Sequence, residues 1–346
     1  MRVFRFDPNA YAEQYARDGY VHVVEGVNPE FLEFALAQAK NMIGADADLR
    51  EWKFKGKKAQ FLFDLPSADD WLGVKDAVAA LTGLSRPALT LCERHIKVYD
   101  ANAPEAPPPH KDRLASEVAV GFPLTVAQGS HLVLYPKHNL DVNRFGSTEL
   151  YRRSLDADAL PEKRLAGVEP VRIDMQPGDV VMFRGSAIYH ERIKAAESIV
   201  LYLKFNALRL DPLSEDPGTA LQRAASLKHL EMAADEELLQ LAIEASPRLD
   251  RVTRLYSRLE WTPILQAQVW GEKEFVISEQ DFGLLKAADG ATPVATLLRT
   301  IGYEEREFAG VLAALRRLVR LQALDFVPAA PSALKERAGE LLSIVE

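Results

Sequence analysis

The sequence predicts a mixed α and β protein in which a strand-rich region is followed by a mostly helical one. Short apolar runs separated by proline and glycine turns fill residues 94 to 206. A segment with two prolines, a glycine and several acids follows at 208 to 220, and helical periodicity dominates after it. At 346 residues and 48% hydrophobic content, the chain can bury a substantial core. We therefore predict two domains, residues 1–215 and residues 216–346.

Two helices and a short strand open the chain. Asp7 caps a helix that begins at Pro8, and Gly19 can end it in the left-handed conformation. Residues 20 to 24 then form a strand, and a second helix begins at Pro29 with apolar side chains along one face. We expect these two helices to buttress the sheet.

His110 and Asp112 stand at the start of a strand. Residues 94 to 100 form the strand before them, and the next nine residues contain four prolines, which exclude a helix or a central strand. In an extended strand, side chains two apart point to the same face, so His110 and Asp112 converge while Lys111 turns away. They are either two ligands of one metal ion or a surface hydrogen-bonded pair.

A second histidine, His190, lies at the rim of the predicted sheet. A strand at residues 171 to 175, a Pro-Gly-Asp turn and a strand at 180 to 183 precede it. Two imidazoles and one carboxylate form the ligand set of non-heme Fe(II) oxygenases, which leaves coordination positions free for chemistry. We therefore predict a metal site made of His110, Asp112 and His190.

The order of the motifs adds a family resemblance. An H-x-D motif at His110, Gly-Ser-His at 129–131, P-G-D-V-V-x-F from Pro177 and a later histidine follow one another along the chain. This order resembles the phytanoyl-CoA dioxygenase family of Fe(II)/2-oxoglutarate oxygenases. The opening YAEQYARDGYVHVVEGVNPEFLEFAL is also similar to the start of that family, and the resemblance covers residues 7 to 209. Gln128 departs from it, standing where a proline usually precedes Gly-Ser-His.

The resemblance implies a fold and a reaction. The fold would be a double-stranded β-helix, that is, a jelly roll like that of cupins. His110, Asp112 and His190 would hold Fe(II), with 2-oxoglutarate and O2 as cosubstrates. The enzyme would hydroxylate or otherwise oxidise an unactivated C–H bond of a small-molecule substrate, in secondary metabolism. Family members that halogenate carry a small residue in place of the carboxylate, so Asp112 favours hydroxylation.

The same resemblance implies that a cation on the strand after His190 holds the far carboxylate of 2-oxoglutarate, but the usual arginine is missing there. Counting by twos along that strand places Lys204 on its inner face, so we favour Lys204. Arg192 offers a bidentate fork, although it lies only two residues beyond His190. Lys97, the only charged residue expected to face inward on its strand, needs an anion from the protein or from a ligand. His131 has either a capping role or, as the resemblance implies, a place beside the cosubstrate.

The composition excludes several classes of protein. Cys92 is the only cysteine, so no intrachain disulfide can form, and the N-terminus lacks the apolar core of a signal peptide. No apolar run is long enough to cross a bilayer. We expect a cytoplasmic protein without a membrane partner. The formal net charge of -8 disfavours nucleic acid as a partner, since phosphate binding needs a basic surface.

The second domain is predicted to be helical and winged-helix-like. Helices are expected at 219 to 233 and 235 to 245, and three more follow a capping box that starts at Ser278. Residues 323 to 327 would return as a strand of a terminal hairpin. We expect this domain to form a homodimer or to wall the mouth of the active site, and not to recognise DNA.

Two alternatives remain open at the level of sequence. The β-helix could be a non-enzymatic sensor whose helical domain binds DNA or a partner protein, or a cupin-like metalloenzyme that does not use 2-oxoglutarate. No phosphate-binding loop and no dinucleotide fingerprint is present to suggest other chemistry.

Overall fold

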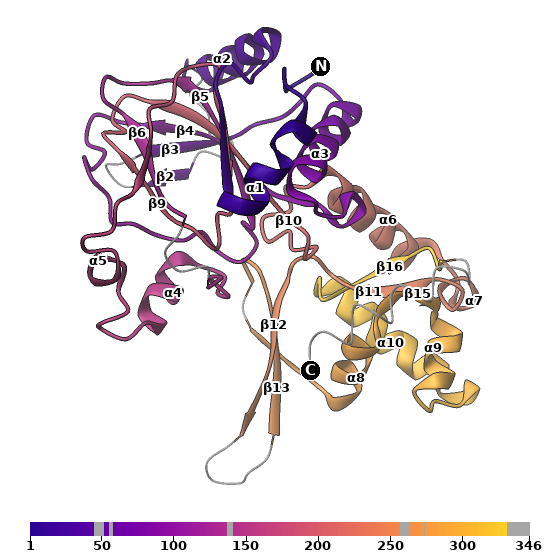
Figure 1. The fold of residues 1–346 in the computed structure, drawn as a ribbon. Helices are drawn as coiled ribbons and strands as arrows, with labels where there is room; N and C mark the ends of the chain where they lie inside the picture. Colours follow the sequence, from indigo (N-terminus) through magenta and orange to yellow (C-terminus); the bar gives the residue numbers. More distant parts are fainter. Residues whose placement is uncertain (45–51, 55–57, 137–140, 257–262, 273, 331–346) are drawn as a thin grey trace. The chain divides into compact units, whose positions relative to one another are not determined.

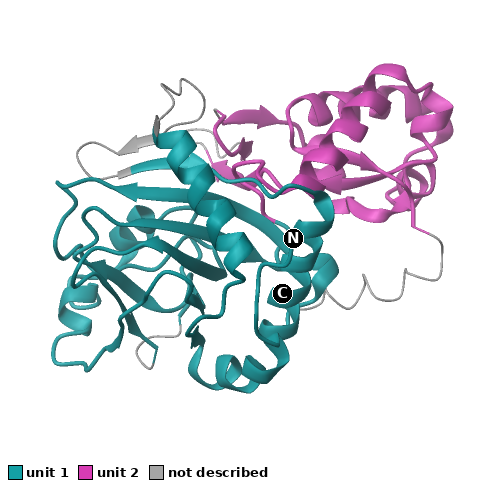
Figure 2. Ribbon diagram, turned by 90° about the horizontal axis from the view of Figure 1, so that it is seen from above, with its two compact units in different colours: residues 1–209 teal, residues 210–346 magenta. Residues whose placement is uncertain are grey.

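In the computed structural model the chain divides into two compact units, Met1–Arg209 and Leu210–Glu346 (Figures 1 and 2). The structure describes residues 1–44, 52–54, 58–136, 141–256, 263–272 and 274–330. Each unit has a hydrophobic core of its own. No helix within these ranges is long and apolar enough to span a membrane.

The first unit is built on a seven-stranded sheet in which all neighbouring strands are antiparallel. Across the sheet, the strands are β1 (Tyr20–Val23), β8 (Val180–Phe183), β5 (Val118–Thr125), β10 (Ile199–Asn206), β4 (Thr90–Tyr99), β3 (Lys58–Leu62) and β2 (Trp52–Phe54). From β1 to β4 the neighbouring strands are not consecutive in the chain, so residues distant in sequence meet on one surface (Figure 1).

A second, three-stranded antiparallel sheet faces the first. Its strands, in order, are β7 (Val171–Ile173), β6 (His131–Tyr135) and β9 (Tyr189–Ile193). His110 extends this sheet by one bridge to His190. Apolar side chains of β5 and β8 pack between the sheets against those of β6 and β7, including Phe183 and Leu132. Two facing antiparallel sheets with this strand order are consistent with the predicted jelly roll.

Helices from the N-terminal half of this unit cover the outer side of the seven-stranded sheet (Figure 1). The helices of this unit are η1 (Pro8–Tyr11), α1 (Ala12–Asp18), α2 (Pro29–Gly44), α3 (Ala68–Thr82), η2 (Arg86–Ala88), α4 (Thr148–Ser154) and α5 (Pro161–Arg164), where η marks a 3₁₀ helix. Phe31, Ala35 and Ala39 of α2, spaced by four, are fully buried in one core with Phe122 of β5. Gly19 ends α1 with φ of 75°, as predicted.

The two faces of β4 and β10 differ in polarity. Ile96 and Leu203 point into the core beneath the helices. The alternate residues Glu93, Lys97 and Lys204 lie on the other face and are 7 to 9% exposed. The prediction that Lys97 is the only inward charge of a strand at residues 94 to 100 is wrong, because β4 already begins at Thr90 and so includes Glu93, four positions before Lys97 on the same face.

The second unit combines helices with two small antiparallel sheets. Its helices are α6 (Pro217–Met232), α7 (Asp235–Leu238), α8 (Glu279–Ala287), α9 (Val294–Thr300), η3 (Glu305–Glu307) and α10 (Phe308–Arg320). One sheet contains, in order, β15 (Asp289–Pro293), β11 (Ala242–Ala245) and β16 (Leu324–Val327), and the other contains β12 (Leu249–Tyr256), β13 (Pro263–Val269) and β14 (Phe275–Ile277). Ser278 caps α8 in the predicted capping box with Asp281.

Two predictions for this unit are wrong. The expected helix at 235–245 ends at Leu238, and residues 242–245 form β11 instead. Ala242 and Ile243 are fully buried in the middle strand of a sheet, so tertiary packing overrides the local helical pattern. Residues 324–327 do form a strand, β16, but it is not part of a terminal hairpin among the described residues. Its partner in the sheet is β11, which lies far earlier in the chain.

Candidate metal centre

The structure brings His110, Asp112 and His190 together. The backbones of His110 and His190 are hydrogen-bonded to each other in both directions, at 3.0 and 2.9 Å, and their ring centroids are 4.5 Å apart. The amide of Asp112 donates to the carbonyl of Gly185 at 2.9 Å. One ligand atom from each of the three side chains lies within 4.8 Å of the other two. Across the described ranges of the chain, no other such group of three is found.

The imidazole of His190 is oriented as a metal ligand. Its Nδ1 lies 3.0 Å from the carbonyl oxygen of Ile188, which accepts a hydrogen bond from the protonated Nδ1. The lone pair is then on Nε2, which lies 3.8 Å from Oδ2 of Asp112. Burial lowers the pKa of His190, which favours the neutral form that binds metal ions.

The carboxylate of Asp112 has one satisfied oxygen and one open oxygen. Oδ1 accepts a hydrogen bond from Nζ of Lys204 at 2.8 Å. Oδ2 is buried and accepts no hydrogen bond from any described residue. Burial by itself raises the pKa of Asp112, but the Lys204 ammonium and then the imidazoles of His190 and His110 lower it to about 2. An ionised oxygen without a donor, aimed at an imidazole, is suited to a cation.

Gly185 allows this carboxylate to approach the backbone. A Cβ atom at position 185 would lie 2.7 Å from the carbonyl oxygen of Ser116 and 2.9 Å from Oδ2 of Asp112. Any larger residue would therefore push on the open oxygen itself.

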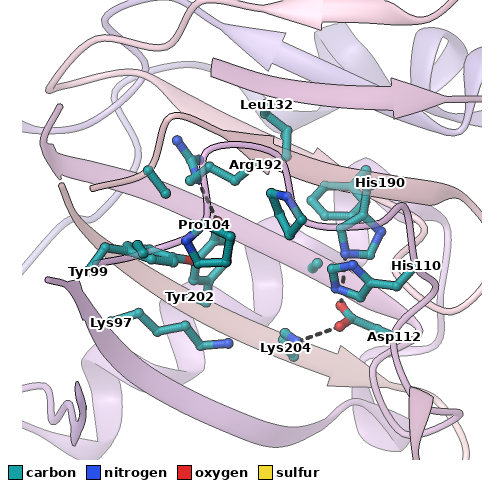
Figure 3. Close-up of a pocket in the computed structure, with 15 residues that line it drawn as sticks. Lys97, Tyr99, Pro104, His110, Asp112, Leu132, His190, Arg192, Tyr202 and Lys204 are labelled. Atoms are coloured by element: carbon teal, nitrogen blue, oxygen red, sulfur yellow. Dashed lines mark hydrogen bonds and ion pairs between the residues drawn. The ribbon is translucent and has the colours of Figure 1, made fainter. Parts of the chain in front are cut away.

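A cavity of about 190 Å³ extends from the three residues. Figure 3 shows His110, Asp112 and His190 at one end and Arg192, Tyr99 and Tyr202 at the other. Ala103, Pro104 and Pro107 of the proline-rich loop also line the cavity. This volume is smaller than the roughly 300–1,000 Å³ of sites for drug-sized ligands, so a small molecule would fill it.

Arg192 is a buried cation at the far end of the cavity. It is 5% exposed. Its Nε donates to the hydroxyl of Tyr202 at 3.2 Å and its Nη2 to the sulfur of Met175 at 3.3 Å, while Nη1 has no hydrogen-bond partner among the described residues. No described carboxylate lies within ion-pair distance of it. A buried charge in this state is costly unless an anion joins it.

The other three residues predicted to bind the cosubstrate are either paired with carboxylates or absent from the lining of the cavity. Lys97 lines the cavity and pairs with Glu93 at 3.0 Å. Lys204 also lines it, but its ammonium is taken up by Asp112 and, at 3.5 Å, by Glu93. His131 is not among the residues that line the cavity, and its Nδ1 lies 2.9 Å from the carbonyl oxygen of Gly129.

Three residues of the site were not singled out from the sequence. Glu93, Tyr99 and Tyr202 each stand two or four positions from a singled-out lysine on the same strand, Lys97 or Lys204. Extending the two-residue alternation from those lysines would have found all three.

Comparisons with known proteins give only distant likenesses. No protein-family profile matches the chain, and no curated protein matches it. Solved structures similar to 57% of this chain include the non-heme α-ketoglutarate-dependent epimerase SnoN from nogalamycin biosynthesis (15% identity, 82% of that chain, TM-score 0.44). They also include the carbocyclase SnoK from the same biosynthesis (14%, 82%, 0.43) and a Pseudomonas putida prolyl-4-hydroxylase (18%, 98%, 0.38). At these values, any inference of function rests on the residues of the site and not on the likenesses.

Proposed function

We propose that the chain is an Fe(II)/2-oxoglutarate-dependent oxygenase that oxidises an unactivated C–H bond of a small molecule. The observation that carries the proposal is the pairing of two features in one small cavity. A His–Asp–His set with an open carboxylate oxygen lies at one end, and a buried arginine without an anion lies at the other.

The residues at the metal end fit Fe(II). His110 and His190 supply nitrogen donors and Asp112 supplies one oxygen, which is the facial set that leaves positions open for other ligands. When bound, iron with 2-oxoglutarate and O2 would supply the oxidising power that no side chain provides. The retained carboxylate at Asp112 favours hydroxylation within this class of reaction.

The residues at the far end fit the distal carboxylate of 2-oxoglutarate. Arg192 offers Nη1 and its fork to a carboxylate, and the hydroxyl of Tyr202 already fixes its Nε side. This choice replaces Lys204, which we favoured from strand alternation alone, because the ammonium of Lys204 is engaged by Asp112.

The charge of the buried cluster supports a dianionic ligand. Three cations, Lys97, Arg192 and Lys204, are at most 9% exposed, and Arg113, which also pairs with Glu93, is partly buried. The carboxylates of this cluster are Glu93 and Asp112, which are equally buried. Two positive charges are therefore in excess even before a divalent metal ion binds. A dicarboxylate would offset that excess.

The second unit, in our proposal, serves protein contacts such as homodimerisation and not DNA binding. On α10, Arg316 lies 2.6 Å from Asp235, and Arg317 pairs with Asp281. These two arginines of the helix are therefore paired within the chain and do not form the free basic surface that phosphates need.

The test is metal-dependent handling of 2-oxoglutarate. With Fe(II) and O2, the purified protein should form succinate from 2-oxoglutarate, and His190→Ala should form none. His131→Ala, which replaces a histidine outside the cavity, is the matched control and should retain the activity. In anaerobic calorimetry, 2-oxoglutarate should bind only when a divalent metal is present. A protein that binds metal but never 2-oxoglutarate would favour the cupin-like alternative, and one that binds neither would favour the sensor.

A further inference from the structure

Lys204 holds one oxygen of the Asp112 carboxylate. Its Nζ lies 2.8 Å from Oδ1 of Asp112, and the side chain is 7% exposed. Since Oδ1 is engaged, only Oδ2 is left facing His190. The contact therefore determines which oxygen is offered to a metal ion.

Glu93 holds Lys204 in place. The two residues lie directly opposite each other in the register of β10 and β4. Oε2 of Glu93 is 3.5 Å from Nζ of Lys204 and 3.6 Å from Nη2 of Arg113, and its Oε1 is 3.0 Å from Nζ of Lys97. A carboxylate held by three cations moves little. Because the register of β10 and β4 places Lys204 opposite this carboxylate, it also determines where the Lys204 ammonium lies.

We infer that Lys204, held by Glu93, is a positioning residue that fixes Asp112 as a one-oxygen metal ligand. The inference rests on the proposed metal site. It assigns Lys204 to the metal end of the cavity and leaves the cosubstrate end to Arg192.

One-oxygen ligation has a chemical purpose. Three protein ligands on one face of an octahedral ion leave three positions open, whereas a carboxylate that binds through both oxygens would occupy one of them. The hydrogen bond from Lys204 prevents Oδ1 from turning toward the ion. It also orients Oδ2 before the ion arrives, as hydrogen bonds to ligating carboxylates generally do.

The test measures metal affinity in Lys204→Ala. Equilibrium dialysis with Co(II) at one fixed pH should show binding about 10- to 100-fold weaker than in the wild type, the usual cost of removing such a support. Propylammonium can enter from the cavity that Lys204 lines and should restore most of the affinity, whereas propanol, of similar size but uncharged, should not. Lys163→Ala is the matched control, since Lys163 pairs with Asp158 at 2.9 Å on the surface and is not among the residues that line the cavity, and it should bind Co(II) as the wild type does.

Each outcome decides one question. If Lys204→Ala binds Co(II) like the wild type while Asp112→Ala does not, the metal site stands and the positioning role fails. Equal restoration by propanol would reduce Lys204 to a packing role and overturn the inference. If the wild type does not bind Co(II), or Asp112→Ala binds it equally well, the proposed function itself fails. Should Lys204→Ala not fold, Lys204→Met keeps the apolar volume, and its Co(II) affinity is compared directly with that of the wild type, without the added amine.

Discussion

At the metal end of the cavity, Lys204 has a carboxylate on either side, whereas at the far end Arg192 has none among the described residues. Both side chains are cations less than a tenth exposed. A buried ion pair is neutral without a ligand, whereas a buried lone cation is neutralised only when an anionic ligand binds. The charge of Lys204 is therefore neutralised within the chain, whereas that of Arg192 would, in our proposal, be neutralised by the cosubstrate.

The largest expected effect of this difference is on the stability of the metal-free protein, where the two cations should act with opposite sign. Lys204→Met leaves Asp112 without its ammonium and should lower the free energy of unfolding by about 3–5 kcal/mol. Arg192→Met removes a buried charge without an anion and should raise it by about 1–4 kcal/mol. Urea unfolding with chelator present measures both. Effects of the same sign would contradict the comparison.

The next effect is on cosubstrate affinity. Arg192→Met should weaken binding of 2-oxoglutarate to the metal-loaded protein by about 1.5–3 kcal/mol, since a hydrogen-bonded charged partner is lost. That is roughly a tenfold to 150-fold rise in Kd, measured by calorimetry. The affinity of Arg192→Lys for 2-oxoglutarate should lie between those of the wild type and Arg192→Met, because an ammonium keeps the charge but lacks the planar fork. Metal affinity without 2-oxoglutarate serves as the control and should not change.

Gly185→Ala sharpens the comparison by disturbing only the metal end. The added methyl meets a backbone oxygen at 2.7 Å and Oδ2 of Asp112 at 2.9 Å. We expect a loss of about 1–3 kcal/mol of stability, together with weaker metal binding. Gly73→Ala, in α3 with no atom within 4 Å of the new methyl, is the matched control. It should leave metal binding unchanged and gain up to about 1 kcal/mol of stability.

The smallest effect is on acid stability. The pKa of Asp112 is about 2 in the folded protein against a usual 3.8, so the unfolded chain binds more protons in that interval. The stabilising contribution is full above about pH 4 and is lost as the pH falls through 2. In Lys204→Met, burial should dominate and raise this pKa, so protonation would stabilise the fold as the pH falls. Unfolding free energies measured from pH 5 to pH 2 should show the two opposite slopes.

Short-range sequence patterns predicted which residues meet at the metal end of the cavity better than which cation is left without an anion at the far end. The two-residue spacing of His110 and Asp112 and the turn before His190 are features of short segments. Whether Arg192 or Lys204 is free for a cosubstrate depends on what lies across the sheet. The register that places Glu93 opposite Lys204 joins segments far apart in the chain, and no periodicity encodes it.

The same limit explains the errors in the second unit. The segment 235–245 has a helical pattern, yet Ala242 and Ile243 enter a sheet between β15 and β16. The capping box at Ser278 depends only on neighbouring residues, and it forms as predicted. The predicted helix failed where contacts with distant strands outweighed the local helical propensity.

The backbone bridge between His110 and His190 links the site to the folding of the chain. Eighty residues separate the two histidines, and each donates its amide hydrogen to the carbonyl of the other. Contacts of such long range form late, after the loop-closure entropy between them has been overcome. In a nascent chain, the three candidate ligands therefore come together only after both segments have docked. Exchange of these two amide hydrogens with solvent would time that docking and report every later opening of the site.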